Sequence, residues 1–145
     1  MNDLAQEAHT IIQTLSLLER LRRYGDARLV GSVQLDLVVK LDIDIHVLVN
    51  GLDLLNIIDS IYHQLWKEDL IHEVRISDYR PEGVKIGFDR YPGASGDWSI
   101  DIWVTNRVET TAFGFVEHLK KELLPKHRSA IMNIKRYLPP SRTAA

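Results

Sequence analysis

Two aspartates that alternate along one apolar stretch are the residues of this sequence best suited to chemistry. Asp42 and Asp44 stand two apart between Leu41 and Val49. Side chains two apart on a β-strand point to the same face, roughly 6.6 Å apart along the chain. Carboxylate oxygens are the hard ligands that Mg²⁺ prefers. Metal ions held in this way position a polyphosphate and neutralise the charge that develops during phosphoryl or nucleotidyl transfer.

A glycine–serine turn precedes the two acids. Gly31 and Ser32 follow the apolar Val30, and nine residues separate Ser32 from Asp42. Glycine lets the backbone approach a phosphate closely, the serine hydroxyl adds a donor, and the N–H groups at the start of a following helix attract anions. We therefore expect Gly31 and Ser32 to hold substrate phosphates beside the acids.

A third acid stands later in the chain, within the alternating stretch from Trp98 to Thr105. Asp101 lies there between Ile100 and Ile102, so its side chain points away from the apolar face. A third carboxylate from a neighbouring strand would complete a site for two metal ions. The simpler interpretation is a half-exposed sheet face with solvated acids, but three acids that face one another repel unless a cation or a basic partner lies between them.

The spacing of these residues resembles a known signature. In the DNA polymerase β superfamily of nucleotidyltransferases, a hydrophobic residue, Gly and Gly or Ser are followed after about ten residues by Asp, a hydrophobic residue, Asp or Glu, and another hydrophobic residue. Here the two parts are Val30-Gly31-Ser32 and Asp42-Ile43-Asp44-Ile45. The motif covers few residues, but the order of the elements over residues 25–105 also agrees with the small catalytic core of that superfamily.

The resemblance implies roles for five residues. Asp42 and Asp44 would be metal ligands, and Asp101 would be the third ligand and the base toward the acceptor hydroxyl. Gly31 and Ser32 would contact the nucleotide phosphates. The implied protein is an enzyme that moves a nucleoside monophosphate from a nucleoside triphosphate, ATP by preference, to a hydroxyl of a small molecule or a protein. Its cofactor would be Mg²⁺, with two ions in the site.

Within the superfamily, the segment from Lys40 to His46 looks most like the drug-modifying adenylyltransferases, and it is also similar to the small GrpB-like proteins. The preceding residues 33–40 are mainly apolar, whereas many small members have a basic stretch there. Two other classes of function stay open: a non-catalytic nucleotide-binding module, and a minimal nucleotidyltransferase antitoxin that acts on a partner toxin.

Several other residues allow both a functional and a structural interpretation. His46 shares the face of Asp44 and could orient a carboxylate, although a lone histidine on a strand is more often structural. Trp103 could stack on a base, although packing is the commoner role. Basic residues near the end of the chain could contact a triphosphate or only be solvated; they are Lys120, Lys121, Lys126, Lys135 and Arg136.

Apolar periodicity predicts an α/β (α+β) fold, with a mixed, mostly antiparallel sheet of about five strands, helices packed on one face and C-terminal helices. The expected helices are Leu4–Tyr24, a short helix or turn over 33–40, Leu52–Trp66 and two helices over 109–138. The expected strands are Arg28–Val30, Leu41–Val49, His72–Tyr79, Val84–Tyr91 and Trp98–Thr105.

Composition limits the remaining options. The 145 residues, 45% of them hydrophobic, predict a single domain over 1–145 with its core at about 25–105. A net charge of -2 gives no overall basic field for a nucleic-acid duplex. The sequence contains no cysteine and no apolar run of membrane-spanning length, so we expect a cytoplasmic protein. Because little chain lies outside the core, an acceptor pocket would need the C-terminal helices or a second subunit, which makes a homodimer one option.

Overall fold

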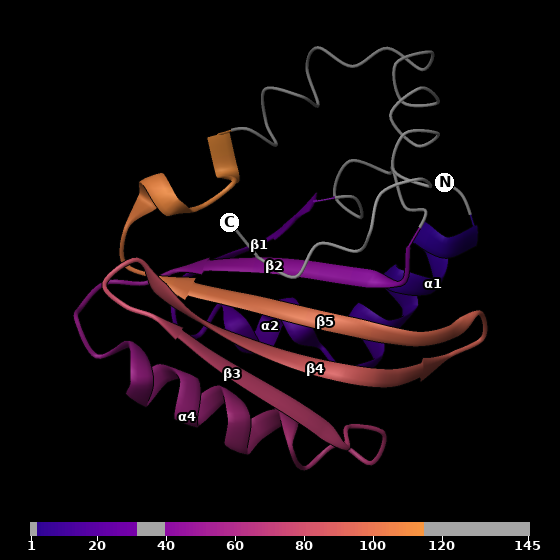
Figure 1. Cartoon of the computed structure of the whole chain (residues 1–145). Helices are drawn as coiled ribbons and strands as arrows, with labels where there is room; N and C mark the ends of the chain where they lie inside the picture. The colour runs from indigo at the N-terminus through magenta and orange to yellow at the C-terminus, as the bar shows by residue number, and fades with distance from the viewer. Residues whose placement is uncertain (1–2, 32–39, 115–145) are drawn as a thin grey trace.

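A computed structural model describes residues 3–31 and 40–114, which form a five-stranded sheet with helices on one face (Figure 1). The strand order is β1-β2-β5-β4-β3, and all neighbours are antiparallel except the parallel pair β2 and β5. The strands are β1 (Asp26–Val30), β2 (Asp42–Leu48), β3 (Glu73–Tyr79), β4 (Gly83–Gly93) and β5 (Gly96–Thr105). The helices are α1 (Asp3–Thr14), α2 (Leu17–Leu21), α4 (Leu54–Leu65) and the 3-10 turn η1 (Val108–Thr110). The predicted fold class is therefore confirmed.

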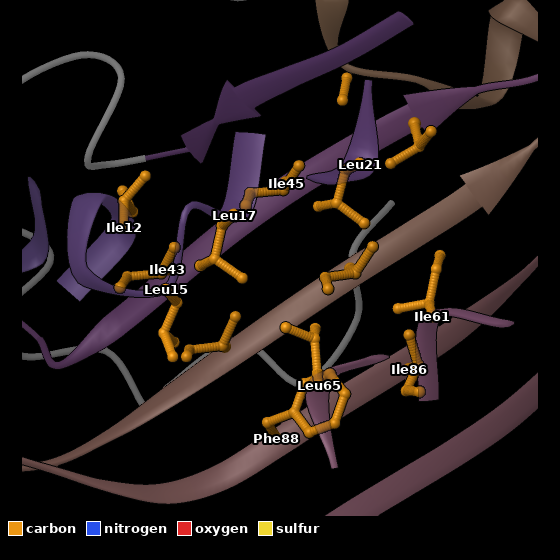
Figure 2. Close-up of a cluster of buried hydrophobic side chains, with 14 of the residues drawn as sticks. Ile12, Leu15, Leu17, Leu21, Ile43, Ile45, Ile61, Leu65, Ile86 and Phe88 are labelled. Atoms are coloured by element: carbon orange, nitrogen blue, oxygen red, sulfur yellow. The ribbon is translucent and has the colours of Figure 1, made fainter. Parts of the chain in front are cut away.

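The core lies between the sheet and helices α1, α2 and α4. Alternate strand residues such as Ile43 and Ile45 on β2 or Ile86 and Phe88 on β4 point toward the helices and are fully buried. Figure 2 shows these side chains against Leu65 of α4 and apolar residues of α1 and α2. Each buried aliphatic or aromatic side chain of this kind contributes about 1.5–3 kcal/mol through removal of apolar surface from water. One face of the sheet thus packs against the helices and forms the core, and the opposite face carries polar residues.

The N-terminal helix differs from the prediction of one helix over Leu4–Tyr24. It breaks after Leu15, where Ser16 adopts a left-handed backbone conformation with φ of 49°. Leu15 and Leu17 would lie about 200° apart around a continuous helix, and could not both face the sheet. The break lets both side chains be buried in the core.

Glu7 connects α1 to the turn between β4 and β5. Its carboxylate accepts hydrogen bonds from the backbone N–H of Ser95 at 2.9 Å, from the Ser95 hydroxyl at 2.6 Å and from the indole N–H of Trp98 at 2.8 Å. These bonds hold the helix against the hairpin that carries β5.

Two of the predicted helical regions fall largely outside the described residues. The helix or turn expected at 33–40 is described only at Lys40, which lies in a bend, and the helices expected over 109–138 are described only as far as residue 114. The second region begins with the 3-10 turn η1, and α-helical backbone is described at 113–114. Within residues 3–31 and 40–114, no helix has the length and apolar character needed to cross a membrane.

Candidate active site

The three predicted acids lie on the sheet face opposite the core. Asp42 and Asp44 belong to β2, and Asp101 belongs to the neighbouring parallel strand β5. Asp44 and Asp101 are partners in the register, while Asp42 is opposite Ser99. Asp42 and Asp44 are half-buried, and Asp101 is 5% exposed. The fold therefore brings a carboxylate from a distant part of the chain beside the pair that the motif identifies.

Gly31 lies against one of these acids. Its φ is +71°, and a Cβ at this position would lie 2.9 Å from Oδ2 of Asp44. Glycine is therefore required twice, by the backbone conformation and by the closeness of the carboxylate. The second residue of the turn, Ser32, lies outside the described residues, as do the C-terminal basic residues 120–136. Their predicted contacts with phosphate stay predictions.

An arginine from the edge strand β3 contacts the third acid. The guanidinium of Arg75 donates from Nη2 to Oδ1 of Asp101 at 3.3 Å. The same guanidinium donates to both carboxylate oxygens of Asp89 on β4, at 3.1 and 3.2 Å. Arg75 is 42% exposed, whereas the Asp101 side chain is 7% exposed. A partly exposed cation thus reaches into the buried end of the site.

The contact between Arg75 and Asp101 spans three strands and depends on a glycine between them. Arg75 is the register partner of Gly87, and Gly87 is the partner of Asp101. A Cβ on Gly87 would lie 2.8 Å from Oδ1 of Asp101 and 2.9 Å from Nη2 of Arg75. The missing side chain leaves the path along which the guanidinium reaches the acid.

Burial and neighbouring cations act in opposite directions on Asp101. Desolvation raises the pKa of this carboxyl above its ordinary value, and the nearby Lys85 and Arg75 partly offset the rise. Lys85 on β4 is only 1% exposed. The pKa of Asp89 is lowered, chiefly by its hydrogen bond from Arg75. Asp101 is therefore a buried carboxylate whose charge is compensated by protein cations.

The donor set has the chemistry that a divalent cation requires. Asp44 and Asp101 provide hard oxygen ligands from register partners, and Asp42 adds a third on the same face. Across the described ranges, however, no three carboxylate or imidazole side chains are close enough together to hold a metal ion. The three acids are thus of the right chemical type to bind a metal ion, and they lie at neighbouring positions on β2 and β5. The Asp101 carboxylate, however, accepts a hydrogen bond from Arg75.

His46 and Trp103 occupy neighbouring positions on β2 and β5 and are both buried. The imidazole Nδ1 of His46 accepts a hydrogen bond from the backbone N–H of Ala112 at 3.2 Å. The indole of Trp103 donates to the Thr110 hydroxyl at 3.3 Å, and its ring lies over Gly83, where a Cβ would come within 2.5 Å of it. Both side chains hold residues 110–112 against the sheet, in agreement with the structural interpretation.

A cavity of about 510 Å³ lies at the far end of β2, and no acid of the site lines it. Its walls come from the segments that follow β2 and β5 and from the turn between β3 and β4; among them are Asn50, Leu52, Arg80, Pro81 and Arg107. Asp44 is separated from the end of β2 by four residues, or about 13 Å of strand. The cavity is therefore distinct from the three acids.

Four residues of this face were not identified from the sequence: Arg75, Lys85, Gly87 and Asp89. Three of them alternate along β4 with the buried Ile86 and Phe88, so the period of two could have assigned them to the polar face. No local sequence pattern indicates which residue of an adjacent strand lies beside each of these four residues, because those neighbours depend on the order of the strands in the sheet.

Comparison with known proteins supports the fold. The chain has the fold of several solved nucleotide polymerases. The Cid1 poly(U) polymerase with Mg and 3′-dATP bound has a TM-score of 0.67 and 20% sequence identity, over 93% of this chain and 41% of that one. A cytoplasmic RNA terminal U-transferase has a TM-score of 0.62 and 21% identity, over 93% and 39% of the two chains.

A third similar structure is the polymerase core of TRAMP, an RNA surveillance complex, with a TM-score of 0.60 and 25% identity over 90% of this chain and 40% of that one. The chain thus spans about two fifths of the polymerases that it resembles. No family profile and no curated protein matches the sequence.

Proposed function

We propose that this protein transfers a nucleoside monophosphate from a nucleoside triphosphate to a hydroxyl group, with Mg²⁺ as cofactor. The observation that carries the proposal is the register of the parallel pair β2 and β5. It sets Asp101 opposite Asp44, with Asp42 on the same face. The fold of the similar polymerases supports the proposal, because they include a poly(U) polymerase with Mg and a nucleotide bound.

The residues of the site divide the work between them. Asp42, Asp44 and Asp101 would hold the divalent cations, which when bound neutralise the triphosphate and lower the pKa of a bound hydroxyl. Asp101 is buried beside the other two acids and would also accept the proton of the acceptor hydroxyl. Gly31 lacks a Cβ, which lets the Asp44 carboxylate lie against the turn, and its backbone would contact the nucleotide phosphates.

The proposal also concerns which molecule provides the acceptor hydroxyl. One of the similar structures is an RNA terminal U-transferase, which adds a hydroxyl of RNA to the small molecules and proteins that the sequence motif suggests as acceptors. The resemblance to drug-modifying or GrpB-like branches stays a prediction, because the similar solved structures are a poly(U) polymerase, an RNA terminal U-transferase and the polymerase core of TRAMP. A single-stranded RNA end would fit this chain better than a duplex, since the net charge of -2 provides no broad basic surface.

The test is transfer of label from α-³²P nucleoside triphosphates in the presence of Mg²⁺. The acceptors offered to the full chain are a short single-stranded RNA, a panel of hydroxylated small molecules and the protein itself. Asp44→Asn and Asp101→Asn should each abolish transfer, because each removes a charged oxygen from the metal site. Circular dichroism should show that both variants keep the wild-type fold.

Asp59→Asn is the matched control. Asp59 lies on α4, on the other side of the sheet, and is 68% exposed, so transfer should stay at the wild-type level. Equal transfer by wild type and Asp44→Asn would contradict the proposal. The proposal would also be contradicted if the folded protein transferred label to none of the acceptors and did not bind Mg²⁺-nucleotide.

A further inference from the structure

We propose that Arg75 is hydrogen-bonded to Asp101 when no cation is bound, and that it pairs only with Asp89 when a divalent cation binds. Arg75 therefore lowers the affinity of the site for the cation. The inference rests on the proposed function, because it concerns the third acid of the same site. It assigns Arg75 as a positioning residue that acts through Asp101.

The geometry gives the guanidinium two partners. Arg75 donates to both oxygens of Asp89 and, at 3.3 Å, to Oδ1 of Asp101. The bonds to Asp89 are the shorter ones, at 3.1 and 3.2 Å. Arg75 can therefore release Asp101 and keep an ion pair with Asp89. Because its side chain is 42% exposed, this movement needs no rearrangement of the core.

Arg75 holds one oxygen of Asp101 away from the strand that carries the other two acids. Asp44 and Asp101 are register partners, yet across the described ranges no three acid or histidine side chains are placed to share a metal. The Asp101 oxygen that faces Arg75 is held toward β3, away from β2. A cation between β2 and β5 must compete with the guanidinium for this carboxylate, since both require its negative charge.

The charge balance favours competition over cooperation. Arg75 is a positive charge beside a proposed ligand, so it repels an incoming divalent cation directly. It is not required to balance Asp101 after the cation is bound, because the cation itself and the buried Lys85 provide positive charge there. Removal of Arg75 should thus strengthen binding of the metal ion.

The experiment measures Mn²⁺ affinity of the full chain by the electron paramagnetic resonance signal of free Mn²⁺, without nucleotide or turnover. Arg75→Gln should bind Mn²⁺ about three- to fivefold more tightly than wild type, the upper part of the range for a partly exposed charge pair. The matched control is Arg80→Gln, which removes the same charge from an arginine just beyond the end of β3. Arg80 is 48% exposed and pairs with Asp78, so its loss should leave the affinity within about twofold of wild type.

A double-mutant cycle tests the role of Asp89. In wild type, Asp89→Asn removes the second partner and leaves Arg75 on Asp101, so Mn²⁺ binding should weaken. In the Arg75→Gln background, the same substitution should have a clearly smaller effect. An effect of equal size in both backgrounds would show that Asp89 acts only through its own charge, and would overturn the proposed movement.

The outcomes separate this inference from the proposed function. If Asp44→Asn abolishes Mn²⁺ binding while Arg75→Gln leaves it unchanged or weaker, the metal site stands and the role of Arg75 is wrong. If neither wild type nor Arg75→Gln binds Mn²⁺, both proposals fail. Tighter binding by Arg75→Gln that Asp44→Asn still abolishes is the result that supports both.

Discussion

Replacement of Gly31 by alanine tests the link between the turn and the first acids. A left-handed φ of +71° costs a residue with a Cβ about 1–2 kcal/mol. The new methyl group would also lie 2.9 Å from Oδ2 of Asp44, so the carboxylate must give way by about 0.5 Å to reach an ordinary 3.4 Å contact. We expect a total loss of about 2 kcal/mol in the free energy of unfolding. For a domain of this size, this lowers Tm by about 4–8 °C.

The displaced carboxylate should cost more in activity than in stability. A shift of this size at a reacting centre lowers kcat by roughly 10- to 100-fold, measured as label transfer at a temperature well below the Tm of the variant. The stability loss is measured by thermal denaturation followed by circular dichroism.

Gly51→Ala separates the two effects of the substitution. Gly51 also has a positive φ, +105°, but no described atom lies within 4 Å of the position of its Cβ. Its replacement should therefore lower Tm through the backbone alone and leave label transfer per folded molecule unchanged. If Gly31→Ala stays folded and transfers label as fast as Gly51→Ala, the reasoning about Gly31 and Asp44 is refuted.

Three further substitutions test the packing and the charges. Asp101→Asn should become more stable relative to wild type as pH rises from about 3.8 through the raised pKa of Asp101. The reason is that ionisation of this buried acid destabilises only the wild type. Chemical denaturation at several pH values would show a constant difference in the free energy of unfolding if this is wrong. Glu7→Gln should lower Tm at neutral pH, with the difference shrinking as pH falls below about 4.5, since the hydrogen bonds to Glu7 lower its pKa. A Tm difference independent of pH would count against this. Ile45→Ala should lower the free energy of unfolding by about 2–5 kcal/mol in urea denaturation, because Ile45 is fully buried; a loss below 1 kcal/mol would disagree with the packing.

Local patterns in the sequence predict much of the sheet. Strict alternation from Asp42 to Leu48 places the acids on one face and the isoleucines on the other, and the structure has this arrangement. The same period assigns Asp101 to the polar face of β5. The parallel pairing of β2 and β5 is a long-range contact between strands that are far apart in sequence, and no local pattern predicts it.

The contacts of Asp101 could not be predicted in the same way. Arg75 reaches it because Gly87 leaves a gap on the strand between them, and this depends on three strands being in register at once. The break after Leu15 was missed for a similar reason. Helical periodicity continues through Ser16, and only the burial of both Leu15 and Leu17 against the sheet reveals the advantage of a break.

The most direct test of nucleotidyl transfer compares two labels on the same nucleotide. The full chain is incubated with Mg²⁺ and an acceptor, and with ATP labelled at either the α- or the γ-phosphate. If the protein transfers a nucleoside monophosphate, the α-label enters the acceptor, the γ-label leaves as pyrophosphate, and both events stop in Asp44→Asn. Transfer of the γ-label to the acceptor, or α-label transfer that persists in Asp44→Asn, would contradict it.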